Sequence, residues 1–249
     1  MQTIDLFGVK VSAIDQEGIL AQVAAWVQEG QCRRVTYVNA HCLNIAISDP
    51  AYHTLLNRFD LIYSDGIGVV WAARFLHGVR LYKATGRNWI GGYCDLAERE
   101  HLRTYILAGK PGVAQKAKQN IEARWPGINI AGAADGYFVE KSEAQVLSEI
   151  AERRPQVLLV GMGVPKQEEW LVRQAGNLDV PVCWAVGALF DYVAGVERPV
   201  PQRVDALGLE WLWRMLVNPR GKLQRYLVGN PRFITHVLWH KIKITFIVK

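Results

Sequence analysis

The feature that most constrains the fold of this chain is a regular alternation of short apolar runs with segments of helical spacing. The apolar runs predict strands at 34–39, 60–64, 103–109, 128–133, 156–163 and 180–187. The intervening segments predict helices near 15–29, 41–58, 67–77, 87–101, 112–125, 142–153, 165–176 and 188–194. Strands that are apolar on nearly every residue are typical of sheets covered on both faces. The alternation therefore predicts an α/β fold: a mostly parallel sheet with helices on both faces.

The alternation stops after "ERPVPQR" (197–203), where two prolines interrupt regular structure. We therefore expect two parts, an α/β domain at 1–197 and a basic helical appendage at 198–249. The appendage has ten Lys or Arg and two Asp or Glu, whereas the rest of the chain has 19 and 21. Such a basic segment favours an anionic partner, which is a nucleic acid, a phosphate-bearing ligand or an anionic membrane.

The appendage has two interpretations. In the first, one apolar face packs against the α/β domain and the cations are solvated. That face is formed by Trp211, Leu212, Leu216 and Leu223. In the second, the cations bind phosphates while neighbouring aromatic and aliphatic side chains enter a bilayer interface. Those cations are Arg214, Arg220, Lys222, Arg225 and Arg232. We favour membrane attachment.

Three further patterns indicate where the protein resides. No apolar run reaches the ~18 residues of a membrane-spanning helix. The first residues lack the basic and then apolar pattern of a secretory signal. Four cysteines without CxxC spacing predict reduced thiols. We therefore expect a cytoplasmic protein.

Polar and glycine-rich turns follow several predicted strands. Asp65 comes directly after the strand at 60–64, and Asn39 ends the strand at 34–39. Glycine turns that could receive a pyrophosphate follow two later strands, at Gly109, Gly112, Gly161 and Gly163. Ligands of an open α/β sheet bind beyond the carboxyl ends of its strands, so these residues could share one cleft. Asp65 could equally cap the helix expected to begin after it.

The sequence lacks the motifs of several common enzyme classes. "GMGVPK" places Lys166 where the dinucleotide fingerprint needs a third small residue, and no GxxxxGK[ST] loop is present. There is no HExxH and no Asp-x-Asp, so we expect no metal site. If a phosphate leaving group is stabilised, arginine, lysine and helix N-termini must do it.

Several stretches, taken in order along nearly the whole chain, resemble one family of enzymes. They include "VTYVNAHCLNIAISDP", "DGIGVVWA", "GVPKQE", "VGALFDYVAGVERPVP" and "LGLEWLWR". The sequence resembles the WecG/TagA/CpsF bacterial glycosyltransferases. Each stretch alone is weak, but "DGIGVVWA", "GVPKQE" and "LGLEWLWR" in this order are specific.

The resemblance implies a Rossmann-like catalytic domain and an inverting, metal-independent glycosyltransferase without a cofactor. The expected donor is a UDP-sugar of the N-acetylmannosamine or N-acetylmannosaminuronate type. The expected acceptor is a polyprenyl-diphosphate-linked saccharide used in surface or exopolysaccharide synthesis. The enzyme would be peripheral on the inner face of the cell membrane and contact its anionic surface. It would bind no nucleic acid, and self-association is left open.

The resemblance also assigns roles to particular residues. It implies that Asp65 is the catalytic base. The implied substrate-binding residues are Thr36, Asn39, Lys83, Thr85, Gln167, Arg214, Arg220 and Arg225. At Lys83 many members have arginine, and a lysine keeps the charge but loses bidentate phosphate recognition. Many members also read Arg-Ala-Pro where this chain has "RPVP" (198–201).

Other functions remain as alternatives. A UDP-glucose-type hexosyltransferase of the same family is one. A nucleotide-cofactor oxidoreductase or sugar epimerase is another, although no Tyr-x-x-x-Lys pair or complete dinucleotide fingerprint supports it. A non-catalytic scaffold that docks through the basic appendage is the third. Bound NAD(P) would indicate the oxidoreductase or epimerase. Hydrolysis of a sugar donor, or transfer from it, would reject the scaffold.

Overall fold

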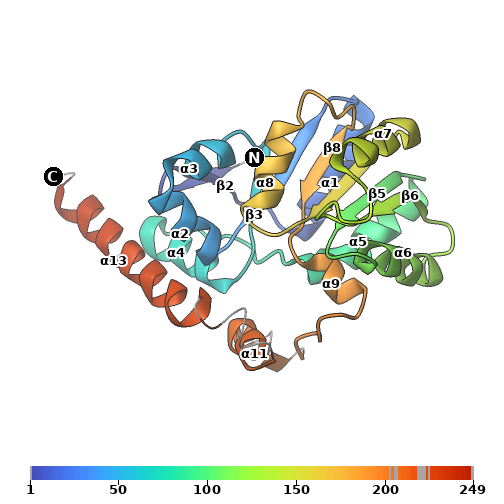
Figure 1. Ribbon diagram of the computed structural model, residues 1–249. Coiled ribbons are helices and arrows are strands. Elements are labelled where there is room, and N and C mark those ends of the chain that lie inside the picture. Colours follow the sequence, from blue (N-terminus) through green and yellow to red (C-terminus); the bar gives the residue numbers. More distant parts are fainter. Residues whose placement is uncertain (1, 202, 205–206, 218–222, 224, 248–249) are drawn as a thin grey trace.

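A six-stranded sheet forms the centre of the computed structural model, which describes residues 2–201, 203–204, 207–217, 223 and 225–247 (Figure 1). The strands are β3 (Arg33–Val38), β4 (Leu61–Ser64), β5 (Arg103–Ala108), β6 (Asn129–Ala134), β7 (Val157–Gly161) and β8 (Val182–Ala185). Their order across the sheet is β4-β3-β8-β7-β5-β6, and every neighbouring pair is parallel. The predicted α/β fold is confirmed.

Helices cover both faces of this sheet. Parallel crossovers are right-handed, so connections that step in opposite directions along the sheet place their helices on opposite faces. One layer contains α1 (Gln16–Glu29), α5 (Gly86–Arg99), α6 (Val113–Arg124) and α9 (Leu189–Val193). The other contains α2 (Ala40–Ser48), α3 (Pro50–Leu56), α7 (Glu143–Arg153) and α8 (Lys166–Arg173). Because the six strands are parallel, their carboxyl ends, from which α2, α6, α7, α8 and α9 continue, share one edge of the sheet.

An N-terminal hairpin was not expected from the sequence. It pairs β1 (Thr3–Leu6) with β2 (Val9–Ser12) in antiparallel register. Phe7 and Gly8 form its turn with φ values of 59° and 82°, as a type I′ turn requires. Exposed and buried residues alternate along β1. An alternation of polar and apolar residues predicts a strand, but over only four residues it was overlooked in the sequence.

The predicted helix at 41–58 is wrong in one respect, because the segment forms two helices. Asp49 ends α2 and caps α3, its Oδ1 accepting hydrogen bonds from the backbone N–H groups of Ala51 (2.9 Å) and Tyr52 (3.3 Å). Pro50 lies in the first turn of α3, where the missing N–H costs nothing. An Asp-Pro pair is thus the local cause of the break.

The appendage contributes α11 (Glu210–Val217) and α13 (Gly229–Ile247). Helix α13 contacts α2 and α4 (Ile67–His77) and runs outward past them (Figure 1). Its Phe233 and Val237 are buried in the same apolar cluster as the α/β domain. Leu216 and Leu223, expected to pack in the first interpretation, are exposed. The boundary near 198 stays a prediction.

Candidate active site

Asp65 lies where β4 ends, beside the end of β3. Its backbone N–H donates to the carbonyl of Val38 at 2.8 Å, which fixes the turn against the neighbouring strand. The next residue, Gly66, has φ 105° and ψ 152°, a conformation that residues with a Cβ avoid. Gly66 is the N-cap of α4, and no described side chain caps that helix. Asp65 therefore does not cap α4, which was the alternative role considered from the sequence.

Two cavities meet at Asp65. The larger has a volume of about 680 Å³ and the smaller about 210 Å³. The residues that line both are Asn39, His41, Asp65, Arg214 and Arg225. One carboxylate therefore faces two adjoining spaces, as a group acting between two reactants requires.

The environment of Asp65 makes it a stronger base than an ordinary carboxylate. Its pKa is raised to about 6, chiefly by burial and also by the nearby carboxylate of Glu210. Arg214, hydrogen bonding by Asn39, and Arg225 act in the opposite direction. A carboxylate with this pKa is mostly ionised at neutral pH yet can accept a proton, which is the property that a general base needs.

Asn39 and His41 occupy the N-terminus of α2. The side-chain oxygen of Asn39 caps the helix, accepting from the N–H groups of His41 (3.0 Å) and Cys42 (3.2 Å). Burial and the charge of Arg225 lower the pKa of His41 to about 4, so its imidazole is neutral at pH 7. His41 was missed from the sequence, although its place two residues after a strand-end Asn was a usable signal.

Glu210 connects the appendage to the α/β domain. Its Oε1 accepts from Arg214 Nη2 on the same helix at 2.5 Å, and its Oε2 lies 3.7 Å from Lys83 Nζ. The guanidinium of Arg214 also lies 5.0 Å from the ring centroid of Tyr192. Two predicted cations are thus held together by a carboxylate that the sequence analysis did not single out.

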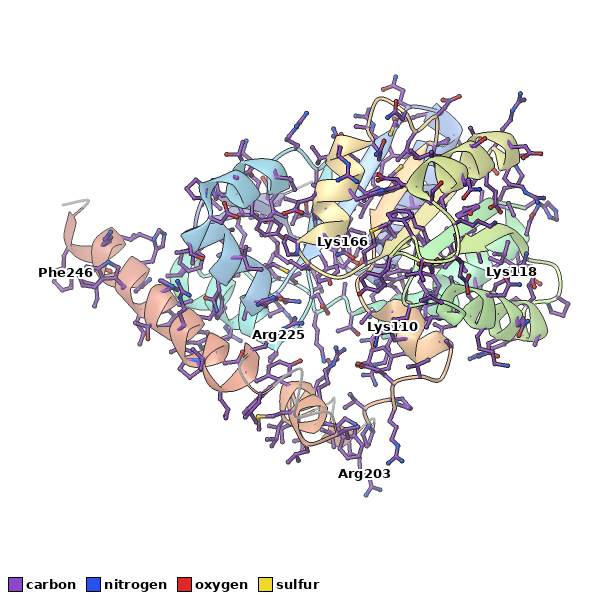
Figure 2. All side chains as sticks on the ribbon, viewed as in Figure 1. Lys110, Lys118, Lys166, Arg203, Arg225 and Phe246 are labelled. Atoms are coloured by element: carbon purple, nitrogen blue, oxygen red, sulfur yellow. The ribbon has the colours of Figure 1, made fainter. Side chains whose placement is uncertain are left out.

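Arg225 lies at the centre of the molecule, between the sheet and the appendage helices (Figure 2). It lines both cavities, as Arg214 does, so two of the three predicted arginines come together around Asp65. The third, Arg220, lies outside the described residues.

Comparison with known proteins decides the class of enzyme. A family model described as "Glycosyl transferase WecG/TagA/CpsF family" matches residues 4–245. The chain belongs to this family. It is therefore a glycosyltransferase, and the oxidoreductase, epimerase and scaffold alternatives are set aside.

Two relatives carry the same descriptive name, N-acetylglucosaminyldiphosphoundecaprenol N-acetyl-beta-D-mannosaminyltransferase. The protein of Bacillus spizizenii (strain ATCC 23059 / NRRL B-14472 / W23) is 28% identical over 79% of this chain and 75% of its own length. The protein of Staphylococcus aureus (strain NCTC 8325 / PS 47) is 27% identical over 74% of this chain and 72% of its own length. The name describes transfer to a sugar on a polyprenyl diphosphate in both relatives.

Thr36 and Gln167 of this glycosyltransferase lie in a buried network behind the site. Thr36 Oγ1 donates to Glu168 Oε1 at 3.0 Å, and Gln167 Nε2 donates to the same oxygen at 2.7 Å. Gln167 Oε1 accepts from the backbone N–H of Gly187 at 2.9 Å. Neither side chain is among the residues that line the two cavities, whereas Gly187 lines the smaller one. Thr36 and Gln167 thus support its wall.

Thr85 does reach the smaller cavity. It is buried, and its hydroxyl has no hydrogen-bond partner among the described residues. Buried polar groups are normally paired, so an unpaired hydroxyl that lines a cavity is suited to bind a ligand.

The four glycines of the two predicted phosphate-binding turns differ in their relation to the cavities. Gly163 lines the smaller cavity, whereas Gly109, Gly112 and Gly161 are absent from the linings of both. A Cβ at Gly109 would lie 2.6 Å from Val113, and one at Gly161 would lie 2.6 Å from the carbonyl oxygen of Gly187. These two glycines therefore meet a packing requirement of the fold.

The acidic, histidine and cysteine residues do not gather into a metal-binding group. In the ranges that the structure describes, no three of these side chains lie where they could hold one ion. All four cysteines are free thiols.

Proposed function

We propose that this glycosyltransferase moves a sugar from a UDP-sugar to a saccharide on a polyprenyl diphosphate, with inversion and without a metal ion. The favoured donor is UDP-N-acetylmannosamine or its uronic acid, since both relatives are named as N-acetylmannosaminyltransferases. The observation that carries the proposal is Asp65, a carboxylate of raised pKa at the junction of two cavities.

In the proposed reaction Asp65 acts as the general base. Its carboxylate takes the proton of the acceptor hydroxyl as that oxygen attacks the anomeric carbon of the donor. A new glycosidic bond forms, and the bond from the anomeric carbon to UDP breaks with its electron pair leaving on the diphosphate. Asp65 then returns the proton to water. Attack opposite the leaving group inverts the anomeric centre.

Cations of the site would stabilise the departing UDP. Arg214 and Arg225 line both cavities, and Lys83 lines the larger one. Preorganised positive charge is most effective where negative charge develops in the transition state. The structure describes no position for Arg220, whose predicted role is the same.

We assign the donor to the smaller cavity. It is lined by the turn residues Gly163 and Gly187 and by Thr85 and Gly86 at the start of α5. The N–H groups at a helix N-terminus and in glycine turns favour phosphate. Asn39 and Thr85 would donate to or accept from sugar hydroxyls or the acetamido group.

We further propose that the enzyme acts as a peripheral protein on the cytoplasmic face of the membrane. The acceptor's lipid makes a membrane surface the place of reaction, and the basic appendage suits an anionic surface. None of the described helices has both the length and the apolarity to cross a bilayer.

The test is a panel of UDP-sugars offered to the purified enzyme with a polyprenyl-diphosphate-linked N-acetylglucosamine acceptor, with and without a chelator. Mass spectrometry should identify an acceptor enlarged by one N-acetylmannosamine or its uronic acid, and the chelator should not lower the yield. Transfer from UDP-glucose alone would favour the alternative donor. Absence of transfer from every donor would contradict the proposal.

A further inference from the structure

Two helices next to the active site carry matching rows of exposed apolar side chains. On α4 the row is Ile67, Trp71 and Phe75, and on α13 it is Ile234, Leu238 and Ile242. Spacings of four residues place each row on one face of its helix. Each of the six side chains is 38% to 48% exposed. We call these six residues the α4–α13 apolar surface. Contiguous apolar patches of this kind mark interaction sites.

The two helices run side by side in the same direction. At one end Gly68 faces Phe233, since a Cβ built on Gly68 would lie 3.8 Å from that ring. At the other end Lys241 Nζ donates to the carbonyl of Leu76 at 3.2 Å and lies 5.7 Å from the ring centroid of Phe75. Eight residues separate the contacts on each helix, so the helices stay adjacent for about 12 Å.

The α4–α13 apolar surface is continuous with the cavity that contains Asp65. Ile67, Trp71 and Ile234 line the larger cavity together with Asp65 and Arg225. The ring of Trp71 stacks on Phe75, with centroids 5.4 Å apart and planes 14° apart. Apolar side chains therefore extend from the cavity that contains Asp65, through Trp71, to Phe75 on the outside of the molecule.

We propose that the α4–α13 apolar surface binds the first isoprenoid units of the polyprenyl-diphosphate acceptor. This inference rests on the function proposed above. The acceptor sugar then lies at Asp65, its diphosphate lies beside Arg225 and Arg214, and the lipid leaves the larger cavity over Trp71 and Phe75. A branched hydrocarbon chain needs apolar contact and no hydrogen-bonding partner, which is what these side chains offer.

The charge and position of the α4–α13 apolar surface favour a single isoprenoid chain over a bilayer surface as its binding partner. The inner end of the surface joins a cavity with a carboxylate and two arginines, which a flat membrane cannot enter. Trp239, exposed at 59%, lies about 140° around α13 from Ile234 at 3.6 residues per turn, whereas Phe246 follows Ile242 by four residues and continues the row. Figure 2 shows Phe246 at the outer end of α13, far from Arg225. Trp239, which points away from Ile234, is suited to be the matched control.

The experiment compares acceptors that share one sugar and diphosphate but carry an undecaprenyl, a farnesyl or a short alkyl group, all in detergent. For the unmodified enzyme we expect kcat/KM to be at least tenfold higher with farnesyl than with the short alkyl group. The double variant Trp71→Gln and Phe75→Gln should lose most of this ratio. The control variant Trp239→Gln should keep it. An unchanged ratio in the Trp71 and Phe75 variant would overturn the proposal.

A second measurement separates lipid recognition from membrane docking. Co-sedimentation with phosphatidylglycerol vesicles should be the same for the Trp71 and Phe75 variant as for the unmodified enzyme. Loss of vesicle binding in that variant, with the farnesyl preference intact, would show that the surface docks on the bilayer and would overturn the proposal.

A third measurement does not depend on transfer. A farnesyl diphosphate bearing a photoreactive terminal group should crosslink to peptides from 67–77 and 229–247. Crosslinks elsewhere would overturn the proposal even if transfer is observed. If no acceptor is used but these peptides are labelled, the proposed function fails while the lipid site stands.

Discussion

At the scale of single residues, the chemistry depends on how Asp65 is surrounded. Its place after a strand could be predicted from the sequence, because parallel strands end at one edge of the sheet. Its raised pKa could not, since the causes are burial and Glu210, which lies far along the chain. Glu210 was missed because its contact with Lys83 arises only from tertiary packing, whereas the place of His41 just after a strand-end Asn was a usable signal.

Glu210→Gln should shift the pH dependence of the reaction. The carboxylate of Glu210 helps to raise the pKa of Asp65 to about 6, while Arg214, Asn39 and Arg225 lower it. A base is active when ionised, so kcat/KM falls as the pH drops through this pKa. Without the negative charge of Glu210, burial alone opposes Arg214, Asn39 and Arg225, so the pKa of Asp65 falls.

The measurement is a pH profile of kcat/KM from pH 4.5 to 8. We expect the acidic limb, near pH 6 in the unmodified enzyme, to move to lower pH in Glu210→Gln. The other charged or titratable groups that line these cavities with Asp65 include His41, Lys83, Arg214 and Arg225, and all four are unchanged in this variant. An acidic limb that stays in place would contradict the role given to Glu210.

At the scale of elements, the regular alternation of the sequence predicted the central sheet and most of its helices. The alternation did not predict local features that depend on a few residues, such as the break between α2 and α3 at Asp49–Pro50 and the hairpin turn at Phe7–Gly8. It also could not show that α13 is part of the core. That helix is apolar on several faces, and only the structure shows that Phe233 and Val237 are its buried contacts.

Phe233→Ala should destabilise the whole domain. Phe233 is buried against the α/β domain. The centroid of its ring lies 6.2 Å from that of Phe7, and the two rings meet edge to face. Truncating a buried Phe to Ala costs about 3–5 kcal/mol because it removes apolar contacts and leaves a cavity. We expect a clearly lower Tm and a matching loss of unfolding free energy in denaturant titrations.

Phe246→Ala is the matched control, because Phe246 is on the same helix but exposed. An exposed substitution changes stability by about 0.5 kcal/mol or less. Equal stability of the two variants would contradict the packing of α13 on the domain.

At the scale of the whole molecule, charge is divided between a slightly acidic domain and a basic appendage. The sequence alone predicted this division, because net charge needs no knowledge of the fold. The family resemblance also implied that arginines of the appendage bind substrate, and the structure places two of them, Arg214 and Arg225, in the lining of both cavities beside Asp65. Membrane binding and catalysis would therefore involve the same segment.

Membrane binding should depend on the basic side chains of α13. Arg232 and Lys243 are exposed there, and each basic residue near an anionic surface contributes about 1 kcal/mol. Changing both to Gln should weaken binding to phosphatidylglycerol vesicles by roughly tenfold or more. The control changes Lys110 and Lys116 to Gln, removing equal charge from exposed positions at and just before α6.

Co-sedimentation at low and high salt is the measurement, because salt screens exposed charges. We expect high salt to weaken binding of the unmodified enzyme and of the control. If both variants bind the vesicles equally well, the assignment of membrane contact to α13 is wrong.

The central claim is that Asp65 removes the proton of the acceptor hydroxyl, and the turnover of Asp65→Asn tests it most directly. Asparagine keeps the size of the side chain but cannot act as the base, so kcat should fall at least ~10²-fold. Calorimetric binding of UDP and the Tm should be close to those of the unmodified enzyme. Turnover within about twofold of the unmodified enzyme would contradict the claim.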